Sequence, residues 1–206
     1  MKNAIRNLVK QPGFALIAVL TLGLGIKANT AIFSVVHTLI LRPLPFPRAD
    51  RLAVLATSGI KAEFRAGVAY PDYLDLRERN RSFDDVIAYQ ITRAGLNTGR
   101  TAIPSWVYEA SGNYFDALGI QPYLGRFFHR SDEHGENSSP YIVLSYAYWL
   151  SHFDGDRAAV GRTIPLNKHP YTILGVAPQE FRGTELLFAP DFWVPMIDQE
   201  HVDGWS

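Results

Sequence analysis

The sequence predicts an α+β domain with a mixed sheet, preceded by one long apolar helix. The first observation is an apolar run between Pro12 and Pro43 that contains no other proline. The second is that the rest of the chain alternates short strand-like runs with short helical segments that carry capping and stop residues. The third is the composition of the 206 residues, with 47% hydrophobic and 19% charged side chains, which is ordinary for a globular protein.

The apolar run has the dimensions of a membrane-crossing helix. Roughly 28 residues form about 42 Å of helix, whereas a bilayer core needs only about 20 residues. Residues 14–26 are apolar on every face apart from Thr21 and the glycines, and a helix of this kind is typical of lipid surroundings. We therefore expect residues 13–41 to form a transmembrane helix that projects beyond the membrane as a stalk.

A cleaved signal peptide is the alternative for the same run. Three basic residues precede the apolar core, at Lys2, Arg6 and Lys10. No small-x-small cleavage site follows, and apolar residues resume at Ala31. In this reading the product would be a secreted α+β binding domain whose mature terminus lies between residues 28 and 38.

A small and polar stripe follows one side of this predicted helix. At 100° per residue, one narrow arc contains Gly23, Lys27, Thr30, Ser34, His37 and Thr38. Thr21 and Asn29 fall outside this arc. Small and polar residues on a membrane helix usually face other helices, which predicts a packing face for partner helices. Alternatively, Lys27 extends its ammonium group to the outer interface.

The first twelve residues predict a short amphipathic helix on the membrane surface. Ile5, Leu8 and Val9 alternate with the three basic residues. A frayed basic terminus is the other interpretation. Basic residues flank the apolar run on both sides, so the charge distribution does not decide which end is cytoplasmic.

The remainder, from residue 42, predicts the elements of a mixed sheet with helices on one of its faces. The expected strands are Arg51–Thr57, Val86–Leu96, Thr101–Ala110, Tyr141–Leu144, Arg162–Leu166, Tyr171–Val176 and Phe192–Val194. The expected helices are Tyr70–Arg79, a short one from Ser111 or Asn113 to Leu118, and Tyr146–Phe153 capped by Ser145. Up to Leu144 the order β-α-β-β-α-β has the character of a split βαβ unit.

No catalytic motif or cofactor-binding motif is present. The sequence has no phosphate loop, dinucleotide fingerprint or His-Glu-x-x-His motif, and it has no cysteine. Formal net charge is zero, so we expect no nucleic-acid partner.

One loop could supply metal ligands, through His129, Asp132, His134 and Glu136. A metal-dependent enzyme is therefore a further hypothesis, although a solvated loop is the simpler interpretation. His152, Asp154 and Asp156 could supply ligands in the same way, but Asp154-Gly155-Asp156 is interpreted as a turn. The four tryptophans, at 106, 149, 193 and 205, are interpreted as core or interface residues.

Several motifs in this order resemble a known family. They are Arg6-Asn-Leu-Val-Lys-Gln-Pro-Gly-Phe14, Leu22-Gly-Leu-Gly-Ile26, Ala28-Asn-Thr-Ala-Ile-Phe-Ser34, Leu41-Arg-Pro-Leu-Pro45, Tyr70-Pro-Asp-Tyr-Leu74, Ser111-Gly-Asn-Tyr-Phe115, Leu124-Gly-Arg126, Val143-Leu-Ser-Tyr146, Val160-Gly-Arg-Thr-Ile164, Tyr171-Thr-Ile-Leu-Gly-Val176 and Asp191-Phe-Trp-Val-Pro195. Together they resemble the beginning of a MacB-like, FtsX-type ABC transporter permease, of the group called acidobacterial duplicated orphan permeases.

This resemblance implies an inner-membrane protein with a cytoplasmic amino terminus. It implies a cytoplasmic amphipathic segment (1–12), a transmembrane stalk helix (13–41) and a periplasmic core domain (42–206). A separate ATP-binding subunit would hydrolyse ATP, and the stalk would pass the resulting motion outward for export or mechanotransmission. The implied partners are membrane lipid, further permease helices or a second permease copy, and that cytoplasmic subunit. No cofactor or enzymatic activity is expected in this chain.

Two features depart from the family pattern. Lys27 stands where the family usually has glycine, which bears on how closely another helix could pack there. The family also continues beyond the core domain to further membrane helices, so we expect this chain to be an incomplete fragment of a permease that transports nothing alone.

Overall fold

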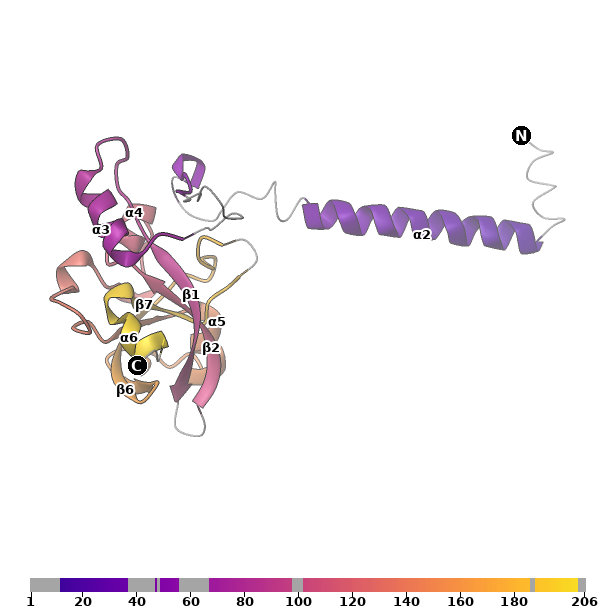
Figure 1. Cartoon of the computed structure of the whole chain (residues 1–206). Coiled ribbons are helices and arrows are strands. Elements are labelled where there is room, and N and C mark those ends of the chain that lie inside the picture. Colours follow the sequence, from indigo (N-terminus) through magenta and orange to yellow (C-terminus); the bar gives the residue numbers. More distant parts are fainter. Residues whose placement is uncertain are drawn as a thin grey trace. The chain divides into compact units, whose positions relative to one another are not determined.

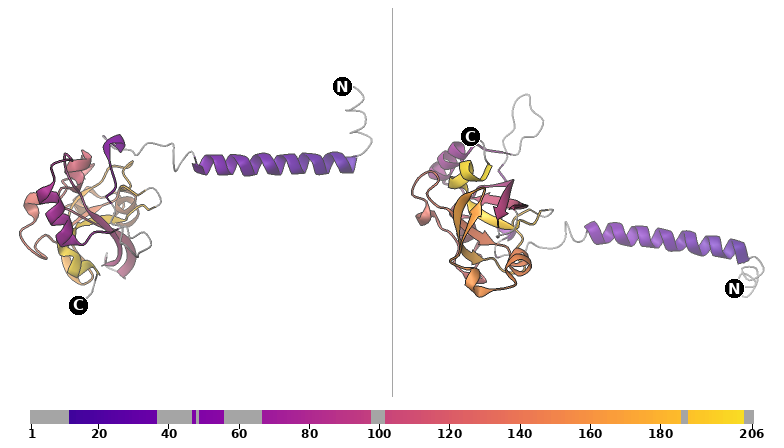
Figure 2. Two further views of the ribbon diagram at one scale, coloured as in Figure 1. Left: turned by 45° about the horizontal axis from the view of Figure 1, so that its top comes forward. Right: turned by 90° about the horizontal axis from the view of Figure 1, so that it is seen from below.

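The structure is a computed structural model that describes residues 12–36, 47, 49–55, 67–97, 102–185 and 188–203. The chain divides into two compact units, residues 1–43 and 44–206. The first contains a single described helix, and the second contains the sheet and all other described elements (Figures 1 and 2).

Helix α2, the long helix of the first unit, covers Pro12–Val36. It begins at Pro12, one residue before the predicted start, and a proline without an N–H is tolerated in the first turn of a helix. Its apolar side chains are exposed in the described chain, as Leu24 at 71% illustrates. The predicted amphipathic segment and the predicted end of the helix, at residues 37–41, lie outside the described residues.

The second unit is built on one mixed sheet. Its strands are β1 (Tyr89–Asn97), β2 (Ala102–Ala110), β3 (Leu124–Gly125), β4 (Tyr141–Leu144), β5 (Thr163–Leu166), β6 (His169–Val176) and β7 (Phe192–Pro195). They run in the order β3-β6-β4-β7-β2-β1-β5, and β5 also pairs with β6. The pairs β2–β7 and β4–β6 are parallel, and the other pairs are antiparallel. The predicted mixed sheet is confirmed.

The additional pairing closes the sheet on itself. Because β5 joins β6 through four residue pairs and joins β1 through Leu96 and Leu166, six strands form a ring. All six strands contribute to one apolar cluster, which therefore lies inside the ring. A second cluster, rich in aromatic rings, covers the outer face of β2, β4 and β7. On β7, Phe192 and Val194 belong to the inner cluster and Trp193 to the outer one, as strand alternation requires.

Helices accompany both of these cores. Helix α5 (Tyr146–Phe153) and helix α6 (Gln199–Asp203) contribute to the inner cluster, whereas α4 (Tyr114–Leu118) contributes to the outer one. The expectation of helices on one face only is therefore wrong. The predicted order β-α-β-β-α-β up to Leu144 is not observed, because residues 51–55 form no strand before α3 and the short strand β3 lies between α4 and β4.

The predicted strand Arg51–Thr57 is wrong over its described residues. Residues 49–51 form a 3-10 turn, η2 (Ala49–Arg51), and residues 52–55 have no regular structure. Val54 is 88% exposed, so its apolar side chain is not buried by a sheet. Alternating apolar residues suggested a strand here, but no strand of the described structure pairs with residues 51–55.

Several other elements that were predicted from short sequence patterns are confirmed. Helix α3 (Tyr70–Arg79) has its predicted bounds, and Ser145 caps α5 by accepting a hydrogen bond at 3.2 Å from the Tyr148 amide. Asn167 and Lys168 both have positive φ, which fits the predicted hairpin turn between β5 and β6. The short 3-10 turns are η3 (Arg130–Asp132), η4 (Arg157–Ala159) and η5 (Met196–Asp198).

Candidate functional site

The predicted packing stripe lies along α2 at spacings of four, three and four residues. Gly23, Lys27, Thr30 and Ser34 are its described members, whereas His37 and Thr38 lie outside the described residues. A Cβ built on Gly23 meets nothing within 4 Å, so the stripe is open to an approaching surface. The Thr30 hydroxyl donates to the Ile26 carbonyl oxygen at 2.8 Å, which satisfies it within the helix. The Thr30 hydroxyl therefore adds no unpaired donor to the stripe, whereas the Lys27 ammonium would need a polar partner in a packed interface.

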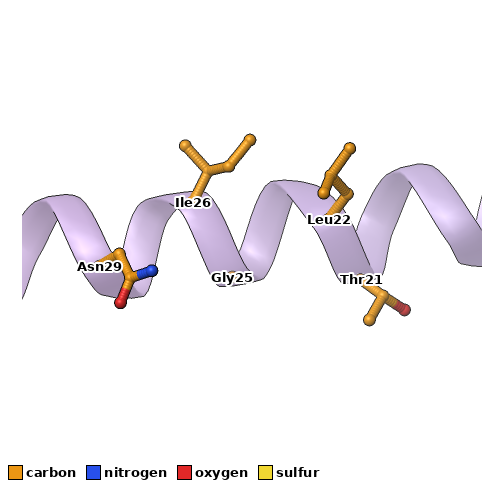
Figure 3. Close-up of a pocket in the computed structure, with 5 residues that line it drawn as sticks. All are labelled: Thr21, Leu22, Gly25, Ile26 and Asn29. Atoms are coloured by element: carbon orange, nitrogen blue, oxygen red, sulfur yellow. The ribbon is translucent and has the colours of Figure 1, made fainter.

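A second row of small and polar residues, which was not predicted from the sequence, lies on the other side of α2. Thr21, Gly25 and Asn29 follow one another at four-residue spacing, and with Leu22 and Ile26 they line a shallow open groove. Figure 3 shows Leu22 and Ile26 projecting on one side of the groove and Thr21 and Asn29 on the other. The i, i+4, i+8 spacing was the signal that could have identified this row.

Among the residues that the structure describes, α2 included, no helix combines the length and the hydropathy that crossing a membrane requires.

The acidic loop between β3 and β4 is held by contacts within the protein. Asp132 accepts two hydrogen bonds from the Arg126 guanidinium, at 2.7 and 3.1 Å, and one from the His129 amide at 2.9 Å. Burial raises the pKa of the Asp132 carboxyl, but these hydrogen bonds outweigh it and leave the pKa below its usual value. His129 Nδ1 lies 2.9 Å from Asp116 Oδ2.

These contacts bear on the metal-site hypothesis for His129, Asp132, His134 and Glu136. Two of the four side chains are engaged with Arg126 or Asp116. In the described part of the chain, no group of three or more histidine or acidic side chains is arranged to hold a metal ion. The described geometry therefore does not support a metal centre in this loop.

The other candidate side chains have structural roles. Asp154 has a φ of 53° at the carboxyl end of α5, and Asp156 accepts from the Ala158 amide at 2.9 Å, which confirms the predicted turn. Trp149 and Trp193 are core residues, as predicted. Trp106 is half-buried, with the Arg93 guanidinium 4.2 Å above its ring. Trp205 lies outside the described residues.

A group of buried acidic side chains was not predicted from the sequence. Asp198 in η5 is fully buried, and its Oδ1 accepts from the Ser139 amide at 3.1 Å. Burial raises the pKa of Asp198 to about 6, and the nearby Glu133 carboxylate adds to the increase. Burial likewise raises the pKa of Glu133, although the Gly112 amide donates to that carboxylate at 2.9 Å. Asp198 stands in a polar stretch without a motif, so only the tertiary structure identifies it.

The sequence profile of the MacB-like periplasmic core domain matches residues 15–204. The chain belongs to this family. The match begins inside α2 and extends one residue beyond α6, so the MacB-like periplasmic core domain here includes described residues of both units. The resemblance proposed from the sequence motifs is confirmed.

Two solved structures are similar to parts of this chain. The periplasmic region of MacB from Actinobacillus actinomycetemcomitans is similar with a TM-score of 0.51 and 20% identity, over 64% of this chain and 56% of that one. The extracellular domain of the noncanonic ABC-type transporter YknZ from Gram-positive bacteria has a TM-score of 0.49 and 15% identity, over 63% of each chain. A comparison with curated proteins gives no match.

The likeness to MacB, at 20% identity, supports the fold alone. The match covers only 56% of the MacB periplasmic chain, so this chain corresponds to part of that region. The family shown by the profile is that of MacB-like periplasmic core domains.

Proposed function

We propose that this chain is part of an ABC transporter permease subunit that connects a cytoplasmic, ATP-hydrolysing partner to an extracytoplasmic domain. Residues 13–41 would anchor it in the inner membrane with the amino terminus in the cytoplasm, and the unit from residue 44 would lie in the periplasm. The observation that carries the proposal is the family match over residues 15–204, which includes both the apolar helix and the sheet domain.

The exposed surface of α2 supports an anchoring role. Its large apolar side chains, such as Leu16, Leu20 and Leu24, are each more than 60% exposed in the described chain. Isolated apolar side chains are normal on protein surfaces, but a continuous apolar helix surface needs lipid or protein to cover it. Lipid would cover most of α2 in the proposed arrangement, and partner helices would cover the stripe at Gly23, Lys27, Thr30 and Ser34.

The domain offers rigid mechanical support rather than chemistry. Its ring of six strands encloses one core, and a second aromatic core covers the outer face. Protein cores are packed about as densely as crystals of small organic molecules, so they deform little under load. A displacement applied at the amino-terminal side of this domain would therefore move the domain as a unit. Binding and hydrolysis of ATP would be left to the partner subunit, and no cofactor would bind to this chain.

Membrane extraction tests the anchoring. The full chain is expressed in a bacterium, and its membranes are washed with alkaline carbonate. We expect the chain to remain in the membrane pellet with an intact amino terminus. Release into the wash, with a new amino terminus between residues 28 and 38, would instead support a secreted domain with a cleaved signal peptide.

A further inference from the structure

An open groove with apolar lining lies beside α3 on the surface of the sheet domain, and the proposed function does not use it. Its apolar lining includes Leu55, Leu76 and Phe83, which are 46%, 45% and 47% exposed. Most of the large apolar side chains exposed in the described part of this unit gather here or directly next to it, since Leu52 and Val54 precede Leu55. Helix α3 lies at the periphery of the domain in Figure 1. Clustered exposure of this kind marks an interaction surface.

The charges along α3 are arranged with opposite signs at its two ends. Asp72 and Asp75 lie toward the amino end, whereas Arg79 lies at the carboxyl end and Arg81 just beyond it, and all four line the groove. At 100° per residue, Asp72, Asp75, Leu76 and Arg79 share one exposed stripe of the helix. The only ion pair that the structure gives these residues joins Arg79 to Asp75 at 3.6 Å, and both side chains are more than 65% exposed.

This charge order is complementary to itself when a second α3 runs in the opposite direction. Residues 72 and 79 are equally far from the midpoint between 75 and 76, about 5 Å along the axis. In an antiparallel pair, Asp72 therefore faces Arg79 of the second copy, and Arg79 faces the second copy's Asp72. Leu76 lies beside the two-fold axis, where it meets its own counterpart. Such a contact between identical surfaces is the usual geometry of a two-fold dimer.

We propose that the α3 groove is a docking surface for a second copy of this chain, with the two α3 helices antiparallel and Leu76 near the symmetry axis. The apolar groove supplies most of the attraction, because exposed ion pairs contribute little individually. The charges fix direction and register, which is the usual contribution of a polar rim. One helix and its flanking loop form a contact below the standard size of a stable interface, so we expect a weak dimer. The inference does not depend on the proposed transport function.

Disulfide trapping tests the contact directly, because the natural chain has no cysteine. Leu76→Cys is introduced into the full chain, and the purified protein is oxidised under mild conditions. Leu150→Cys on α5 is the matched control, because Leu150 is 47% exposed on another surface. We expect a disulfide-linked dimer from Leu76→Cys at a rate at least about ten times that of the control. Equal rates, or cross-linking of Leu76→Cys only to a different protein, would overturn the proposal.

A charge exchange tests the register. In the Leu76→Cys background, Asp72→Arg and Arg79→Asp should each lower the trapping rate by about three- to ten-fold, because each places like charges opposite each other at two symmetric positions. The double variant should recover the original rate. Both changes oppose the helix macrodipole, so loss of helix stability alone would make the double variant worse than either single one. Failure of the double variant to recover would overturn the antiparallel arrangement.

Discussion

The Ser139 amide donates a hydrogen bond to Oδ1 of Asp198 at 3.1 Å, while Oδ2 of the same buried carboxyl has no partner among the described residues. This contact joins the acidic loop before β4 to the turn after β7. Two further bonds reinforce the connection, from the Asn137 amide to the Ile197 carbonyl and from the Asn137 side chain to Glu200. The acidic loop is therefore a structural brace between distant parts of the chain.

We predict that Asp198 makes the stability of the domain depend on pH. Its pKa is about 6 in the folded protein and about 4 in an unfolded chain, so folding favours the protonated form. The contribution of Asp198 to the unfolding free energy is therefore fully present below about pH 4 and is lost as the pH rises through 6. Asp198→Asn should stabilise the domain by on the order of 2–3 kcal/mol at pH 8 and leave it unchanged at pH 4. Denaturant unfolding measured between pH 4 and 8 checks this.

Glu136→Gln is the control for the pH experiment, because Glu136 lies on the same loop with an exposed side chain. It should leave the pH profile unchanged. The same slope of unfolding free energy against pH in wild type and Asp198→Asn would contradict the assignment.

The contact of β3 with β6 predicts a strict requirement for glycine at position 175. A Cβ on Gly175 would lie 2.4 Å from the Arg126 carbonyl oxygen and 2.6 Å from that of Leu124. Backbone atoms cannot move aside as a flexible side chain can, so Gly175→Ala should lower the unfolding free energy by at least about 1–3 kcal/mol. Thermal unfolding measures the change. Gly67→Ala, where a Cβ meets nothing within 4 Å, should have little effect.

The side chain of Asn113 connects α3 and the segment before β1 to the segment before α4, and we predict that this connection contributes to the stability of the domain. Its side-chain amide donates to Asp85 at 2.8 Å and to the Val86 carbonyl at 3.0 Å, and its oxygen faces the Tyr73 hydroxyl at 3.2 Å. Asn113→Ala removes all three of these hydrogen bonds and should cost about 2–3 kcal/mol. Tyr73→Phe removes one hydroxyl, which donates toward Asn113 Oδ1 and the Val86 carbonyl and accepts from Arg77 at 3.3 Å, and it should cost about 1 kcal/mol. Equal effects of the two variants in denaturant unfolding would contradict this account.

Substitutions on α2 distinguish its two small-residue rows. If partner helices pack on the predicted stripe, Gly23→Leu should reduce the amount of the larger assembly that native electrophoresis of gently solubilised membranes detects. Gly25→Leu, on the other side, should leave it unchanged. The reverse result would assign the packing face to the groove at Thr21, Gly25 and Asn29, and an effect of both would indicate partners on two sides.

Elements defined by local chemistry could be predicted from the sequence. Pro71 near the start of α3 and Ser145 at the cap of α5 act within one helical turn, so their consequences can be inferred from neighbouring residues. The positive φ values of Asn167 and Lys168 likewise follow from a two-residue hairpin.

Features that depend on distant pairing could not be predicted. Closure of the ring depends on the contact of Leu96 with Leu166, which are far apart in the sequence. Asn113 stands where a helix cap is expected, yet its side chain makes no cap bond and joins Asp85 and Val86 instead. The apolar alternation at residues 51–55 resembled a strand, but no other strand pairs with it in the described structure.

Labelling of single cysteines in intact cells tests the central claim most directly. Glu180→Cys lies on the exposed surface of the sheet domain, and Asn3→Cys lies before the apolar helix. With a maleimide that enters the periplasm but does not cross the inner membrane, we expect Glu180→Cys to react in intact cells and Asn3→Cys to react only after lysis, with both chains in the membrane fraction. Protection of Glu180→Cys until lysis would contradict a periplasmic sheet domain on a membrane-anchored permease.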